Sequence, residues 1–189
     1  MKKKIESNKE LITKALNKDI FLTTYIIYKN TLFKDCILKP HTLKDDWVYG
    51  VCYTNGGKFD GHFAGLLSKI VFFSENTINP LLLNKAIKYH HEKSNDHKVN
   101  STIIDILNHA KQSKKVIRVF FDNKVRVYKN CFGFVNDVTP ENLVIEVLSL
   151  GEVIGTLTIP LHAILALDYD SEFLKAEKSF HSIQNITGS

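Results

Sequence analysis

Long apolar runs are missing from this chain, and no apolar stretch follows the lysines at its start. No segment approaches the roughly 18 apolar residues that a membrane-spanning helix needs, so the sequence predicts no bilayer span. The opening Met-Lys-Lys-Lys-Ile-Glu lacks the apolar core of a secretory signal, so we expect no export by that route. Cysteine is scarce, and Cys36 and Cys131 are interpreted as small buried apolar residues rather than as a bridge. These features predict a cytoplasmic protein without a membrane partner.

Catalytic and cofactor motifs are also missing. The turn Gly57-Lys58-x-x-Gly61 lacks the Gly-Lys-Ser/Thr ending, and the following helix, of a phosphate-binding loop. His41 with Asp45 and Asp46 has the residue types of a base and its orienting carboxylate, but no nucleophile in a defined elbow accompanies them, which favours a polar loop. We therefore predict that the protein is not an enzyme, with no catalytic residues and no metal or other cofactor.

The bulk composition is that of an ordinary globular protein, with 44% hydrophobic and 11% aromatic residues. A length of 189 residues fits one domain or two small ones. The net charge of +5, from 25 basic and 20 acidic side chains, is too small to imply nucleic acid by itself. It permits an anionic partner wherever the positive charge is concentrated.

An internal repeat is the most informative feature that is present. A unit of about 70 residues occurs twice, displaced by about 95 positions. The matched segments are Ser7-x-x-Glu10 with Thr102-x-x-Asp105, Leu32–Cys36 with Val127–Cys131, and Gly57-x-x-x-Gly61 with Gly151-x-x-x-Gly155. The first of these patterns is typical of a capping box, so each copy is expected to open with a helix.

Each copy predicts a short amphipathic helix followed by five short strands. In the first copy we expect a helix over 7–17 and strands over 20–27, 32–38, 47–53, 59–65 and 69–73. In the second copy we expect a helix over 102–112 and strands over 116–121, 125–134, 143–148, 153–159 and 163–168. A three-residue loop over 122–124 would set Phe121 opposite Val125 and Val119 opposite Val127. Strands this short, with turns every 8–12 residues, favour a small closed or nearly closed barrel.

The second copy resembles the Sm-like family, whose members have an N-terminal helix followed by a strongly bent five-stranded barrel. The first motif of the family corresponds here to Val116–Phe121, Asp122-Asn123, Gly133, Asp137 and Asn142-Leu143-Val144-Ile145, and the second to Ile154-Gly155-Thr156-Leu157. Ile154 stands where the family has an arginine and Thr156 where it has Asp or Asn, so only Asn142 and Gly155 carry over to the family's base-binding pocket.

Through the repeat, the resemblance implies two tandem Sm-like barrels, each preceded by a helix. The expected organisation is a first barrel over 5–75, a helical linker over 76–100, a second barrel over 101–170, and a short helix and tail over 171–189. In the last region, the acidic residues Asp168, Asp170 and Glu172 are expected to cap the final helix.

A basic cluster in the second copy is the strongest functional signal. Its members are Lys111, Lys114, Lys115, Arg118, Lys124, Arg126 and Lys129, among which Asp122 is the one acidic residue. With the predicted strand pairing, Arg118, Phe120, Arg126 and Tyr128 share the face opposite the apolar one. Guanidinium groups bind phosphates and aromatic rings stack on bases, which is the chemistry of a single-stranded nucleic-acid site.

We therefore predict a non-enzymatic binding protein that holds single-stranded RNA or DNA. The predicted site residues are Arg118, Phe120, Lys124, Arg126, Tyr128, Asn142 and Gly155. A solvated barrel face and a surface for an acidic protein are the two other interpretations of the basic cluster. The alternative function is a protein-interaction or oligomerisation module that assembles, as a homo-oligomer, through the edge strands of its barrels.

Overall fold

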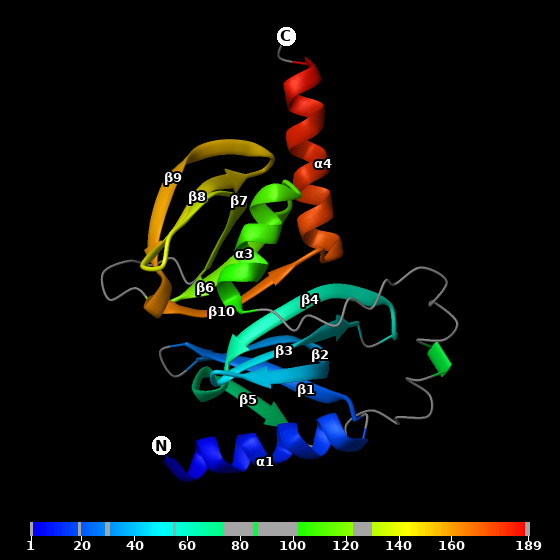
Figure 1. Cartoon of the computed structure of the whole chain (residues 1–189). Helices are drawn as coiled ribbons and strands as arrows, with labels where there is room; N and C mark the ends of the chain where they lie inside the picture. The colour runs from blue at the N-terminus through cyan, green and yellow to red at the C-terminus, as the bar shows by residue number, and fades with distance from the viewer. Residues whose placement is uncertain are drawn as a thin grey trace. The chain divides into compact units, whose positions relative to one another are not determined.

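The structure is a computed structural model and describes residues 2–18, 20–28, 31–54, 56–73, 85–86, 102–122 and 130–187 (Figure 1). It is mainly β with short helices, as predicted. The chain divides into two compact units, Met1–Asn100 and Ser101–Ser189, and each unit contains one copy of the repeat. The predicted linker helix lies largely outside the described residues.

Unit 1 consists of a helix followed by an antiparallel sheet. Its elements are α1 (Lys2–Lys18), β1 (Leu22–Tyr28), β2 (Thr31–Lys44), β3 (Trp47–Tyr53), β4 (Phe59–Leu66), the 3₁₀ turn η1 (Leu67–Lys69) and β5 (Ile70–Phe73). The strands lie in the order β5-β1-β2-β3-β4, so the last strand pairs with the first. The helix α1 lies along one side of these strands in Figure 1.

Unit 2 has the same organisation of a leading helix and five strands, and a further helix follows its last strand. Its elements are α3 (Ile103–Gln112), β6 (Val116–Phe121), β7 (Asn130–Val138), β8 (Asn142–Ser149), β9 (Glu152–Pro160), the 3₁₀ turn η2 (Leu161–Ala163), β10 (Ile164–Tyr169) and α4 (Glu172–Thr187). The strands lie in the order β10-β6-β7-β8-β9, which repeats the order of unit 1.

The backbone repeats in detail as well as in outline. The first glycine of each repeated pair, Gly57 and Gly151, has a positive φ of 78° and 83°, which a glycine adopts without steric cost. The ladder between the second and third strands is interrupted between Pro40 and Thr42 in unit 1, and between Val135 and Asp137 in unit 2. These two interruptions fall at the same place in the two copies, so the repeat extends to the pairing of the strands.

Each leading helix packs an apolar face against the strands that follow it. In unit 1, Ile12 and Ala15 are buried, and the buried Asn8 donates a 2.8 Å hydrogen bond from Nδ2 to the carbonyl of Ile70. In unit 2, Leu107 and Ala110 are buried in the same way. Fully burying a leucine-sized side chain contributes about 2 kcal/mol, so these helices are held mainly by packing rather than by helix propensity.

Two predicted helix limits need correction. The helix α1 begins at Lys2, so Ser7 lies inside it and does not cap its start, whereas Thr102 forms the predicted capping box with Asp105. The last helix was expected to be short, but α4 runs over sixteen residues. The helix is capped by Ser171, whose Oγ accepts a hydrogen bond from the Leu174 amide. The predicted cap, the acidic group Asp168, Asp170 and Glu172, does not have this role.

The predicted register of the first hairpin of unit 2 is also wrong. Val119 lies opposite Cys131 and not opposite Val127, so the observed partner lies four residues beyond the predicted one. The difference is an even number of positions, and side chains alternate between the faces of a strand, so Val119 keeps the buried side that was predicted for it.

Cysteine chemistry differs from the prediction in unit 1. Cys36 on β2 is bonded to Cys52 on β3, with 5.5 Å between their Cα atoms, whereas we expected Cys36 to be a simple apolar residue. Cys131 is a buried free thiol, as expected, and burial raises its pKa to about 12. The predicted cytoplasmic location drew on this interpretation of the cysteines, and a disulfide is more typical of an oxidising compartment.

Candidate binding surfaces

Arg118, the centre of the predicted nucleic-acid face, is paired with a carboxylate within its own unit. It lies on β6 directly opposite Asp168 on β10, and its Nε donates a 2.7 Å hydrogen bond to Asp168 Oδ2. Its Nη2 donates to the same oxygen. Asp168 is 3% exposed, and a carboxylate so deeply buried needs a partner of opposite charge. The positive charge of Arg118 is therefore balanced inside unit 2.

Two other cations of the basic cluster also have acidic partners. Lys111 on α3 donates a 2.8 Å hydrogen bond to Asp137 on β7, and this contact lowers the pKa of the Asp137 carboxyl below its ordinary value. Lys115 forms an ion pair with Asp170 and lies 5.3 Å from the centre of the Tyr169 ring. The sequence interpretation missed the pair of Lys115 because it assigned Asp170 to helix capping, and it missed the pair of Lys111 because it assigned Asp137 to the Sm-like motif.

The aromatic part of the predicted face is only partly described. Phe120 is 7% exposed, and the guanidinium of Arg118 lies 4.8 Å from the centre of its ring. The ring is thus a packing surface for the arginine, and Phe120 offers little area on which a base could stack. The remaining predicted residues, Lys124, Arg126 and Tyr128, lie outside the described residues.

Asn142 and Gly155 were carried over from the family resemblance as parts of one pocket, but they lie apart on the β8–β9 ladder. Asn142 pairs with Pro160 at one end of it, whereas Gly155 pairs with Val147. The two pairs are about 17 Å apart along the strands at the usual rise per residue. Gly155 has a φ of 148°, and a side chain added there would meet no atom within 4 Å.

The edge strand β9 is the most exposed strand of unit 2. Its first five residues, Glu152 to Thr156, are all exposed, and Ile154 is 64% exposed. In the described part of the chain, β8 is its one ladder partner, so the other edge of β9 presents unpaired backbone groups. No charged side chain occurs from Val153 to Pro160. Soluble proteins ordinarily protect a strand edge of this kind with charge, a bulge or a covering element.

The helix α4 holds the start of this strand in place. The amide of Gly151 donates a 3.2 Å hydrogen bond to Glu177 Oε2, and Nδ1 of His181 donates a 2.7 Å hydrogen bond to the Gly151 carbonyl. Both polar backbone groups of one residue are thus bound by a single helix. Since Glu177 is buried, this contact fixes where β9 begins.

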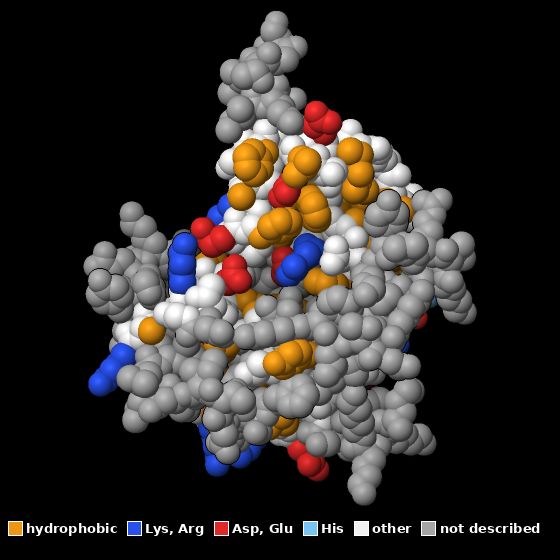
Figure 2. Space-filling view, turned by 180° about the vertical axis from the view of Figure 1, so that it is seen from behind, with side chains coloured by type: hydrophobic (Ala, Val, Ile, Leu, Met, Phe, Trp, Pro, Cys, Tyr) orange, Lys and Arg blue, Asp and Glu red, His pale blue; other side chains and the backbone are white. Residues whose placement is uncertain are grey.

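Exposed apolar side chains gather around the same region. The large apolar side chains that are exposed in the described part of the chain are Leu150, Val153, Ile154, Phe173 and Phe180. All of them belong to the turn before β9, to β9 itself or to α4. Figure 2 shows hydrophobic side chains close together on one face of unit 2, with acidic and basic side chains between and beside them. We call this set of five side chains the β9–α4 surface.

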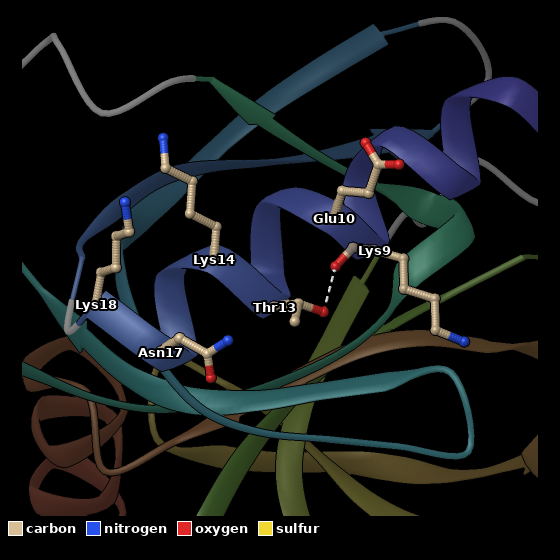
Figure 3. Close-up of a pocket in the computed structure, with 6 residues that line it drawn as sticks. All are labelled: Lys9, Glu10, Thr13, Lys14, Asn17 and Lys18. Carbon is tan, nitrogen blue, oxygen red and sulfur yellow. Dashed lines mark hydrogen bonds between the residues drawn. The ribbon is translucent and has the colours of Figure 1, made fainter.

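A second candidate surface is the polar side of α1. A shallow hollow there is lined by Lys9, Glu10, Thr13, Lys14, Asn17 and Lys18. All six come from one helix, and Figure 3 shows their side chains fanned over its outer side, with Thr13 Oγ1 bonded to the Lys9 carbonyl at 2.8 Å. No buried polar group of the described residues is among them, so the hollow is a basic helix face and not a formed pocket.

Comparison with protein families, curated proteins and solved structures gave no match to this chain. Within the described residues, no helix is long and apolar enough to cross a membrane. The same residues contain no cluster of three or more histidine, cysteine, aspartate or glutamate side chains suited to a metal ion.

Proposed function

We propose that this protein is a non-enzymatic Sm-like assembly module that binds further copies of itself through the edge of β9. The single observation that carries the proposal is the exposure of β9 along an edge that has no partner among the described strands and no charged side chain from Val153 to Pro160. Strand addition at such an edge satisfies the backbone groups by hydrogen bonds and buries the exposed side chains of Val153 and Ile154.

The strand order supports the Sm-like part of the proposal. In both units a helix leads into five antiparallel strands, with a 3₁₀ turn before the last strand and that strand paired to the first. A small bent barrel has this organisation, and it leaves strand edges that must be covered. Two tandem barrels are therefore the architecture that we propose for this chain.

The acceptor for β9 is proposed to be β5 of the next copy. Among the described strands of unit 1, β5 has β1 as its single partner. Each chain therefore offers the edge of β9 as a donor and the edge of β5 as an acceptor. Pairing of two unlike edges is heterologous, which builds a closed ring where the rotation between copies closes and a filament where it does not.

Single-stranded nucleic acid is the less well supported function. Of the described cations of the basic cluster, Lys111, Lys115 and Arg118 have acidic partners. A nucleic-acid site would therefore depend on Lys114 and on Lys124, Arg126 and Lys129, and the last three lie outside the described residues. Loss of oligonucleotide binding as salt is raised would identify such a site, because binding to phosphates releases counterions.

The test is the mass of the full-length protein in solution, measured by light scattering over a range of concentrations. We expect species heavier than the 21.6 kDa monomer, and we expect Ile154→Lys to return the protein to the monomer because a lysine charge would be buried at the new interface. Gln112→Lys is the matched control, since it adds the same charge at an exposed position on α3. A monomeric wild type at high concentration, or an Ile154→Lys variant that still assembles, would overturn the proposal.

A further inference from the structure

The disulfide in unit 1 occupies a defined position between two strands. Leu38 on β2 lies directly opposite Cys52 on β3, so Cys36, two residues before Leu38, is the diagonal neighbour of Cys52. Both cysteines are buried, at 5% and 3% exposed. The bond therefore joins β2 to β3 inside the packed part of unit 1.

The same diagonal pair of positions exists in unit 2, but only one of the two positions holds a cysteine. There Gly133 lies opposite Val147, which reproduces the pairing of Leu38 with Cys52. Cys131 accordingly occupies the position of Cys36, and Val147 occupies the position of Cys52. The two units thus share a backbone site for a disulfide, and only unit 1 has both cysteines.

The free thiol of unit 2 is a poor participant in exchange. Cys131 is buried, and burial raises its pKa to about 12, so very little of the reactive thiolate exists at neutral pH. The sequence contains three cysteines in total. No cysteine therefore remains as an efficient internal thiol to attack the Cys36–Cys52 bond, and its reduction requires an external reductant.

We propose that the Cys36–Cys52 bond makes unit 1 a redox-responsive half of the chain, while unit 2 is insensitive to redox conditions. A dithiol reductant supplies the two electrons. One of its thiolates attacks a cysteine sulfur, the S–S bond breaks, and the other cysteine leaves as a thiolate and takes up a proton. The second thiolate of the reductant then displaces the first cysteine, which also takes up a proton, and the reductant leaves as a cyclic disulfide.

Reduction is expected to loosen unit 1 selectively. The bond closes a loop with a sequence separation of 16 residues, and a loop of that size stabilises the folded state by a factor of roughly 100 in the unfolding equilibrium. Because both sulfurs are buried, the reductant reaches them when β2 and β3 separate, so reduction and local opening promote each other. This inference concerns unit 1 by itself and does not depend on assembly through β9.

The test is hydrogen exchange of the full-length protein, measured by mass spectrometry with and without dithiothreitol. We expect the reductant to accelerate exchange in the segment over 36–53 by up to about 100-fold and to leave the segment over 130–149 unchanged. The intact mass of the oxidised protein should increase by two hydrogen atoms on reduction. An unchanged mass, or exchange that does not respond to dithiothreitol, would overturn the proposal.

A reciprocal pair of variants separates the bond from other effects of the reductant. Cys52→Val gives unit 1 the Cys/Val pair that unit 2 already accommodates, and its exchange should be fast and indifferent to dithiothreitol. Val147→Cys gives unit 2 the complete pair, and it should transfer the response to the segment over 130–149. If Val147→Cys forms no bond with Cys131, as shown by its intact mass, the equivalence of the two diagonals is refuted.

Discussion

Replacing Gly133 with alanine tests whether the close approach of β7 and β8 shapes unit 2. A Cβ at this position would lie 1.8 Å from the carbonyl oxygen of Glu146 and 3.1 Å from the Cα of Val147. The obstructing atoms are backbone atoms, so no rotamer change can make room, and the two strands must move apart. Overpacking of this kind costs up to about 3 kcal/mol, a large part of the stability of a small domain.

The matched control is Gly155→Ala on β9, which is separated from β7 by β8. A Cβ there would meet no atom within 4 Å, so its cost comes from the positive φ of 148° and should be about 1–2 kcal/mol. The single tryptophan, Trp47, belongs to unit 1, so its fluorescence reports on that unit, and the unfolding of unit 2 is better followed by hydrogen exchange in β7 and β8. A Gly133→Ala variant that is as stable as Gly155→Ala would refute the reasoning.

Three further predictions concern single contacts. Asn8→Ala should lower the stability of unit 1 by about 1–3 kcal/mol, seen as an earlier denaturant midpoint of tryptophan fluorescence, because it strips a buried backbone carbonyl of its donor. Thr102→Ala should cost unit 2 about 1 kcal/mol through the lost capping box, and Thr102→Ser, which keeps the hydroxyl, should restore it. Lys111 lowers the pKa of Asp137 in the folded state, so this carboxylate contributes stability above about pH 4, and the contribution is lost as pH falls through the lowered pKa. Lys111→Met should therefore make the stability of unit 2, measured by urea titration, fall less steeply below about pH 4. An unchanged fall in stability with pH would contradict the assignment.

The helices and strands could largely be predicted from the sequence because their signals are local. The strands over 47–53 and 116–121 have the predicted limits, since apolar β-type runs bounded by turn residues determine them. The repeat strengthened the prediction of helices and strands, because a pattern that is weak in one copy is supported by the equivalent pattern in the other. The length of α1 was missed, since a capping pattern at Ser7 can also occur inside a helix.

Contacts between distant residues could not be predicted, and these determine the chemistry of the surface. Arg118 and Asp168 meet only because β10 pairs with β6, and neither residue indicates this pairing by itself. The bond between Cys36 and Cys52 likewise depends on the register of β2 and β3, including the interruption of the ladder after Pro40. An error of even one residue in such a register moves every side chain to the opposite face.

The two units use one backbone plan with different chemistry to hold their strands together. The pairing of Arg118 with Asp168 in unit 2 falls at the positions occupied by Thr23 and Phe73 in unit 1, so the ion pair has no counterpart there. The disulfide of unit 1 has its counterpart in the Cys131/Val147 pair of unit 2, which cannot bond. Ionic contacts weaken at low pH, and a disulfide weakens under reducing conditions. The two halves of the duplicated fold are therefore expected to lose stability under different conditions, unit 1 in reductant through its disulfide and unit 2 in acid through the Lys111–Asp137 pair, in which the pKa of the Asp137 carboxyl is lowered.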